Sequence, residues 1–419
     1  MLYCLSTESH CPQEKKECPI MLQERIESYR KLALDRMRPT EKELRHGLEL
    51  HENSYVFDSY GFMPLGWGDA SRINQLIEEN ASRDEVRAAM EELSMTECFK
   101  DPAQQALLKE VWEASGVDCT FQNSGEESND IERLIRRLSN YTSTADRIPF
   151  YERAVYPEQL PAIRARGNKA LYFTTNGVPV SAKAISAEES LSHIGVFANF
   201  GVRMMHMTYN RRNLLGDGCA EEANGGLSHF GKMAVAEMNR CGVIPDVAHS
   251  GQKTSLDTAL CSKKPVVASH TVAGGLSTHF RRKDDEVVQA IKATGGYVGI
   301  CAHGWFLQGS MDIVAMLDHI DYIARKFGVD HVAIGTDHGF GLSSRDNVKT
   351  APGYRKIFEQ YWPRPEDVNG DMTMEQYNTM AWTNWPLFTV GLVQRGYTDE
   401  EIRKIIGGNV LRVAQESLA

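Results

Sequence analysis

The chain has little that would suit it to a membrane or to nucleic acid. Its 419 residues hold no apolar run near the roughly 20 residues of a membrane span. The first residues lack the basic and then apolar pattern of a secretory signal. Acidic residues outnumber basic ones by 56 to 46, the formal net charge is −10, and no basic block stands out. We therefore expect a cytoplasmic protein that binds neither nucleic acid nor membranes.

The sequence also lacks a disulfide pattern, internal repeats and low-complexity segments. The 9 cysteines are an odd number, and those beyond Cys4, Cys11 and Cys18 are scattered, mostly in apolar segments. We favour buried, reduced thiols over a zinc site at these three, which would need a fourth ligand such as His10.

Short apolar segments do recur along the chain, with helical stretches between them. Such alternation is typical of a parallel sheet covered by helices, and eight units indicate a closed barrel. The sequence thus predicts an α/β fold of the (β/α)8 TIM-barrel type. Its strands are expected at residues 55–58, 117–121, 170–174, 202–208, 243–248, 265–269, 297–301 and 331–336.

The remaining segments predict additions to the barrel. Residues 1–50 are polar and then carry apolar residues at helical spacing, which indicates an N-terminal helical extension. Residues 51–419 would form the barrel domain, with a helical insertion after strand one at residues 70–115.

Residues that follow the expected strands are the candidates for chemistry, because barrel sites form where strands end and loops begin. Three histidines and an aspartate in this set exceed what chance would draw from 13 histidines. We therefore predict a functional role for His249, His270 and Asp337. The full set is Tyr60, Phe62, Asn123, Asn176, Tyr209, His249, His270, His303 and Asp337.

These residue types suit metal-assisted hydrolysis. Neutral imidazoles at His249 and His270 could bind a divalent metal. A carboxylate at Asp337 could orient a metal-bound water and take its proton. Arg281 could hold a substrate carboxylate through two parallel hydrogen bonds, although an arginine in a charged turn is often only a surface residue.

Several long motifs resemble the membrane (renal) dipeptidase family, peptidase family M19, in the same order along the chain. The similarity covers roughly residues 54–415. It is most specific at residues 226–250, which lead into His249, and continues at Ser269-His270. The other matching stretches are residues 213–219, 318–337 and 406–413.

The resemblance implies a metal-dependent hydrolase barrel with two zinc ions. In the family, a His-x-Asp pair after strand one and two later histidines share the metals with a bridging glutamate. By position, His249 and His270 match the later histidines, Asp337 the aspartate that handles the proton, and Arg281 the arginine that binds the dipeptide's carboxylate. Family members are often dimers, so a homodimer is expected.

The sequence departs from this pattern at the other ligands. Tyr60 and Phe62 stand where the His-x-Asp pair belongs, and Asn176 stands where the bridging glutamate belongs. Tyr209 replaces a histidine that would stabilise the tetrahedral intermediate. Because paired zinc ions need anionic ligands, we predict that the two-zinc centre does not form. At most one zinc per chain, or none, would bind His249 and His270, with a third ligand from Asp337, His338, His303 or Asp58.

The first functional hypothesis is a dipeptidase-like metallohydrolase that cleaves a dipeptide or related small amide at a modified or single-metal site. Asp337 and Tyr209 would be catalytic, and Arg281, Tyr60 and Asn176 would bind the small-molecule substrate. One alternative is a diverged barrel enzyme that performs proton transfer or elimination on a small carboxylate, with Tyr60 and Tyr209 as acid/base or binding groups. Another is a non-catalytic small-molecule binding protein with an anion pocket around Arg281.

Overall fold

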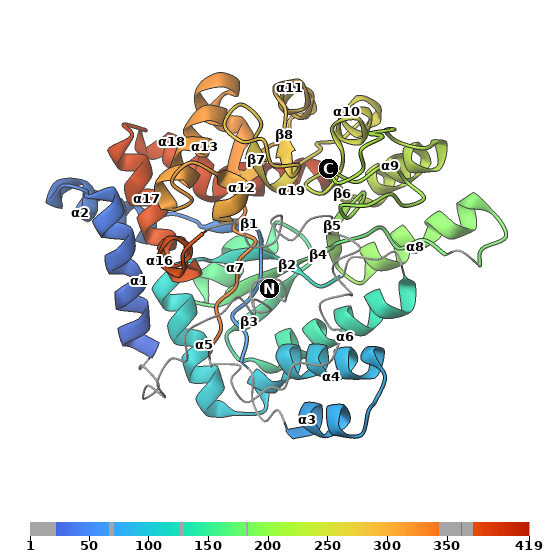
Figure 1. Ribbon diagram of the computed structural model, residues 1–419, viewed down its shortest axis with the longest axis horizontal. Coiled ribbons are helices and arrows are strands. Elements are labelled where there is room, and N and C mark those ends of the chain that lie inside the picture. Colours follow the sequence, from blue (N-terminus) through green and yellow to red (C-terminus); the bar gives the residue numbers. More distant parts are fainter. Residues whose placement is uncertain are drawn as a thin grey trace.

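Eight parallel strands form a barrel at the centre of the molecule (Figure 1), and each contains part of a predicted strand or directly follows one. The computed structural model describes residues 22–66, 71–125, 130–181, 183–342, 362 and 372–418. The predicted (β/α)8 fold is confirmed. Its strands are β1 (Phe57–Gly61), β2 (Cys119–Asn123), β4 (Lys169–Thr175), β5 (Val202–His206), β6 (Ile244–Asp246), β7 (Ala268–Ala273), β9 (Val298–Ile300) and β10 (Val332–Ile334).

Backbone hydrogen bonds close the barrel across both seams between its two sheets. One sheet has the order β1-β2-β4-β5-β6, and the other includes β10-β9-β7. Val247 N donates to Val267 O over 2.8 Å beside β6 and β7. Asp337 N donates to Tyr60 O over 2.9 Å between the end of β10 and β1. Closure of this kind leaves no free strand edge in the barrel wall.

Aromatic rings fill part of the barrel interior. Phe121 stacks on Phe57 at a ring-centroid distance of 5.2 Å and on Tyr172 at 4.9 Å. Met204 of β5 belongs to the same buried cluster. Since alternate residues of a strand face the same side, His206, two residues further along, also projects into the barrel near its carboxyl end.

Helices surround the strands and include those predicted before and after strand one (Figure 1). Helices α1 (Leu22–Met37) and α2 (Glu41–Glu52) pack against α16 (Met374–Thr379) and α17 (Trp385–Gln394) respectively. Residues 1–21 lie outside the described residues, and the division at residue 50 stays a prediction. The stretch 70–115 holds α3 (Ser71–Glu78), α4 (Arg83–Thr96) and α5 (Pro102–Ser115).

The remaining helices connect successive strands or end the chain, and two short strands join the sheets. They are α6 (Ile131–Arg147), α7 (Gln159–Ala165), α8 (Ala187–Asn199), α9 (His229–Cys241), α10 (Gln252–Cys261), α11 (Asp285–Ala293), α12 (Gly304–Leu307), α13 (Ile313–Phe327), α18 (Asp399–Arg403) and α19 (Asn409–Leu418). The sequence did not predict β3 (Tyr151–Ala154), which pairs with β4, or β8 (Arg282–Lys283), which pairs with β7.

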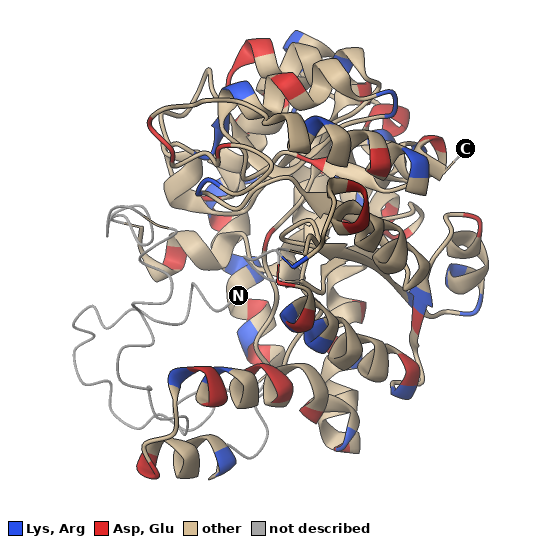
Figure 2. Ribbon diagram, turned by 90° about the vertical axis from the view of Figure 1, so that its right-hand side faces the viewer, with Lys and Arg blue, Asp and Glu red and all other residues tan. Residues whose placement is uncertain are grey.

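Acidic and basic residues are interspersed over the helices in the view of Figure 2, without one large basic face. Within the described ranges, no helix is both long enough and apolar enough to span a bilayer.

Candidate metal and substrate site

Three buried histidines converge at the carboxyl end of neighbouring strands. His206 is the last residue of β5, His249 follows β6, and His270 lies in β7. Their candidate ligand nitrogens all lie within 4.8 Å of one another, and the three side chains belong to residues no more than 2% exposed. The Nε2 atoms of His249 and His270 are only 2.9 Å apart. The cluster therefore has the composition and spacing of a site for one metal ion.

Hydrogen bonds at the opposite ring nitrogen orient each imidazole. The partners of Nδ1 are Asn210 Oδ1 for His249 (2.7 Å), Ser269 Oγ for His270 (2.8 Å) and Thr175 O for His206 (3.0 Å). Burial holds the pKa of His249 and of His270 well below the ordinary histidine value. Both rings are therefore neutral, which is the state that binds a metal.

A buried carboxylate, Asp246, lies directly beside this cluster. Its Oδ1 accepts hydrogen bonds from Ala248 N (2.9 Å) and Ser269 N (3.1 Å), and its Oδ2 lies 2.8 Å from His206 Nε2. Burial alone would raise the pKa of Asp246, but the neighbouring His206, with smaller contributions from His270 and Ser269, lowers it below its usual range. The site therefore holds one wholly buried negative charge next to its three imidazoles.

Two tyrosines cover the histidines. The Tyr60 ring stacks on His270 with centroids 3.8 Å apart and an interplanar angle of 18°. The Tyr209 ring stacks on His249 at 4.1 Å and 24°. The Tyr60 hydroxyl donates to Asn176 Oδ1 over 2.5 Å. The side chains at two predicted substrate-binding positions are thus hydrogen-bonded to each other.

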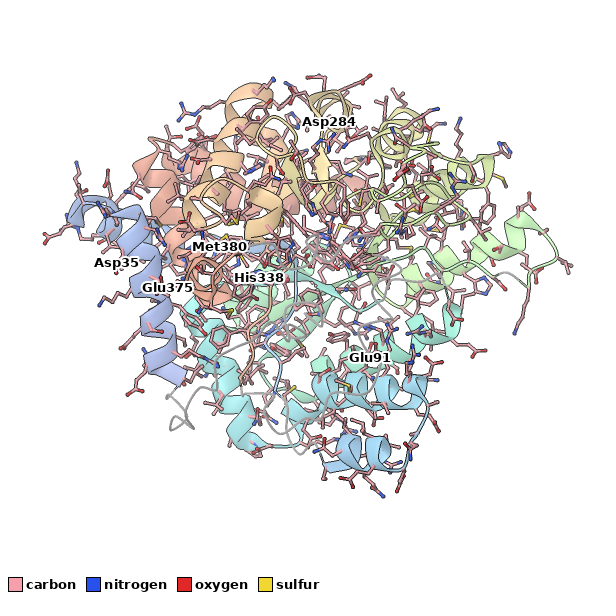
Figure 3. All side chains as sticks on the ribbon, in the orientation of Figure 1. Asp35, Glu91, Asp284, His338, Glu375 and Met380 are labelled. Atoms are coloured by element: carbon pink, nitrogen blue, oxygen red, sulfur yellow. The ribbon has the colours of Figure 1, made fainter. Side chains whose placement is uncertain are left out.

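Asp337 lies near the same ring nitrogen of His270 that faces His249. Its Oδ2 is 4.0 Å from His270 Nε2 and 2.9 Å from His303 Nε2. Burial opposes ionisation of Asp337, but His270 and His303 lower the pKa of its carboxyl below the usual range. Its backbone has a φ of 53°, in the left-handed region, where strain often marks a functional residue. The following residue, His338, lies near the middle of the molecule (Figure 3), 4.8 Å from His303 between ring centroids.

Arg281 is wholly buried beside the same site. Its Nη2 donates to His270 O over 2.9 Å, and its Nε donates to Ala248 O over 3.4 Å. Nη1 is buried and has no hydrogen-bond partner in the described part of the chain. A buried guanidinium with one free edge is suited to an anionic ligand.

A second buried cation, Lys283 of β8, donates from Nζ to Ser250 O over 2.6 Å. Burial lowers the pKa of Lys283 from 10.5 to about 8. Between these pH values the unfolded chain holds a proton that the folded chain has lost, so stability should rise with pH there. We expect the rise to be smaller by about 3 kcal/mol in a Lys283→Met variant. Denaturant unfolding of both proteins from neutral pH to about pH 10 measures the free energy of unfolding at each pH. The same pH dependence in both proteins would contradict the prediction.

All seven predicted site residues lie in one contiguous cluster, although their roles stay predictions. Tyr60, Asn176, Tyr209, His249, His270, Arg281 and Asp337 are connected through the contacts given above. Of the predicted third-ligand candidates, Asp58 is occupied elsewhere: it accepts hydrogen bonds from Thr336 and Trp382. His206 is absent from the predicted set because the predicted strand runs to residue 208, which makes residue 209 the first one past its end. Strand alternation from Met204 was the signal that could have found it.

Comparison with known proteins shows which solved structures this barrel resembles and to which family the chain belongs. It is similar to the structure of an amidohydrolase from Pseudomonas aeruginosa, with a TM-score of 0.65, 24% identity and coverage of 89% of this chain and 99% of that one. This likeness shows that the two proteins share a barrel fold. The family model of membrane dipeptidases matches residues 105–362, and the chain belongs to this family, peptidase family M19, which is metal-dependent.

Two curated fungal relatives are dipeptidases. Dipeptidase tcpJ of Claviceps purpurea is 28% identical over 232 residues, 54% of this chain and 47% of its own length. Dipeptidase verJ of Clonostachys rogersoniana is 30% identical over 230 residues, 52% of this chain and 50% of its own length. The chain thus spans about half the length of the curated relatives it matches.

The residues present do not fit the two-metal centre that the family resemblance implies. Phe62 has no ligand atom, and the Tyr60 hydroxyl and the Asn176 amide oxygen are hydrogen-bonded to each other. Aromatic rings lie against both histidines. Two close dications without a bridging carboxylate would repel each other strongly. The donor set of one metal ion, in contrast, is present.

Proposed function

We propose that this protein is a dipeptidase-like metallohydrolase that cleaves a dipeptide or a related small amide, with at most one zinc per chain. The observation that carries the proposal is the convergence at His270. Within one buried cluster its Nε2 faces that of His249 at 2.9 Å and lies 4.0 Å from the Asp337 carboxylate, while its backbone oxygen holds Arg281.

Each group then has a separate task. His249 and His270 would hold the cation, which when bound polarises an amide carbonyl and makes water more acidic. Asp337, ionised and held by His303 over 2.9 Å, accepts and returns a proton. Tyr209 would donate a hydrogen bond to the reacting carbonyl or act as an acid. Tyr60, which stacks on His270, and Asn176, to which it is hydrogen-bonded, would form one wall of the site and limit the size of the substrate.

Arg281 supports a substrate class that carries a carboxylate. Its guanidinium is fixed by two backbone oxygens, so the remaining edge can bind a carboxylate with little loss of side-chain entropy. A dipeptide presents such a carboxylate one residue away from its only peptide bond. The relatives named above, which are dipeptidases, support the same substrate class.

The proposal also covers the metal, the location and the oligomeric state, for which we propose zinc, the cytoplasm and a homodimer. Three histidines and a carboxylate are ligands that zinc prefers. The net negative charge and the lack of a basic block support a cytoplasmic location. They also support a partner that is neither nucleic acid nor a membrane. The dimer rests on the family resemblance alone, and size-exclusion chromatography with light scattering measures it.

A panel of free dipeptides, incubated with and without added zinc, tests the function through the amino acids released. We expect zinc-dependent hydrolysis that is abolished in His249→Ala, because the cation loses a ligand. The control His193→Ala, on α8, should retain the activity of the unchanged protein. Hydrolysis that persists in His249→Ala would reject the assignment.

The alternatives give other results in the same assay. Conversion of a small carboxylate without amide cleavage would favour a non-hydrolytic enzyme. Dipeptide binding by calorimetry without any turnover would favour a non-catalytic binding protein.

A further inference from the structure

The three histidine rings have the mutual spacing of imidazoles around one cation. Their centroids are 5.0 Å apart for His249 and His270, and 5.3 Å apart for His206 with either of them. With zinc–nitrogen bonds of roughly 2 Å and tetrahedral angles, imidazole centroids are expected about 5 Å apart. His206 therefore stands where a third ring would stand.

The orientation of the rings agrees with this spacing. All three Nδ1 atoms face oxygens of the protein, at 2.7 to 3.0 Å. Metal-binding histidines characteristically donate their other ring N–H to such an oxygen, which fixes the ring and leaves the second nitrogen for the metal. For His206 the oxygen is the backbone carbonyl of Thr175, so its Nε2 remains available.

Two polar atoms next to the cluster are left without a hydrogen bond. His206 Nε2 and Asp246 Oδ2 are 2.8 Å apart, yet among the residues that the structure describes neither has a partner in hydrogen-bonding geometry. Both side chains are wholly buried. The two atoms form an ion-pair contact with each other, and a cation bound between them and the other imidazoles would satisfy both.

We propose that His206, His249 and His270 bind one divalent cation of the zinc class through their Nε2 atoms, with Asp246 Oδ2 as the adjacent anionic ligand. This inference rests on the proposed function only in placing a metal at His249 and His270. It adds a ligand from β5 and a carboxylate from β6. One carboxylate offsets half the charge of one dication, which agrees with a single ion in a site whose bridging glutamate position is occupied by Asn176.

Metal stoichiometry and affinity test the proposal without reference to activity. The full chain is stripped with a chelator, dialysed against zinc or cobalt(II), and analysed by mass spectrometry and visible absorption. We expect one ion per chain and the intense cobalt absorption of a four-coordinate site. Loss of a supporting residue typically lowers metal affinity 10- to 100-fold, so loss of a ligand in His206→Asn should lower it at least about a hundredfold.

Two controls make the result specific. His193→Asn, which alters a histidine on α8 outside the cluster, should retain the affinity. If His206→Asn fails to fold, zinc-edge X-ray absorption of the unchanged protein gives the ligand count, for which we expect three imidazoles. Two imidazoles, two ions per chain, no bound ion, or unchanged affinity in His206→Asn would each overturn the proposal.

Failure here differs from failure of the proposed function. If His206→Asn keeps both its metal and zinc-dependent dipeptide hydrolysis, the third ligand is wrong and the function stands. If the unchanged protein binds one ion through three histidines but hydrolyses no amide, the ligand set is right and the function is wrong.

Discussion

Replacing Arg281 by methionine is expected to lower kcat/KM for dipeptides by about two to three orders of magnitude. The guanidinium is wholly buried, two of its nitrogens are tied to the backbone oxygens of His270 and Ala248, and Nη1 is left for the substrate. Removing one partner of a buried charge pair costs about 2–5 kcal/mol, and each 1.4 kcal/mol corresponds to about tenfold. Steady-state kinetics with a free dipeptide and with the same dipeptide as its amide measures the effect.

The amide substrate and a neighbouring arginine provide the controls for this prediction. An amide lacks the carboxylate, so its kcat/KM should hardly change in Arg281→Met. Arg282→Met should leave both substrates unaffected, because that side chain is partly exposed and pairs with Asp284. Equal losses for the acid and the amide would mean that Arg281 supports the fold of the site rather than the recognition of a carboxylate.

The barrel could be predicted because its signal is repeated along the chain. Each predicted strand lies within a few residues of an observed one, since buried parallel strands must be apolar along their whole length. The two additional strands lack such an apolar pattern: β3 contains Glu152 and Arg153, and β8 spans only Arg282–Lys283, both of which are basic. Its pairing with β7 depends on tertiary contacts rather than on local preference.

The site was harder to predict because its key features are relations between strands. Residues past the strand ends led to His249, His270 and Asp337. His206 is not among these candidates because it lies inside the predicted strand 202–208. In the structure, β5 ends at residue 206. The stacking of Tyr60 on His270 and of Tyr209 on His249 could not be read from the sequence, because each pair joins segments far apart in the chain.

Replacing Gly299 by alanine is expected to destabilise the protein by about 3 kcal/mol or more, near the upper end for overpacking a core. A methyl group at Gly299 in β9 would overlap the carbonyl oxygen of Ser269 in β7. Gly335, at the end of β10, faces the same oxygen, which also accepts a hydrogen bond from Ser59 Oγ over 2.6 Å. Because the obstacle is backbone, a change of rotamer cannot relieve it.

Gly195→Ala is the matched control, and the comparison links barrel packing to the site. A methyl group at Gly195 would lie 3.5 Å from Cys241 Sγ, an ordinary contact, within helix α8. Alanine there should be neutral or stabilise by up to about 1 kcal/mol, as measured by denaturant unfolding. In Gly299→Ala, relief of the overlap must move Ser269, whose neighbour in the chain is His270. We therefore expect metal affinity to fall together with stability in Gly299→Ala, and a variant as stable as Gly195→Ala would refute the close approach of β9 to β7.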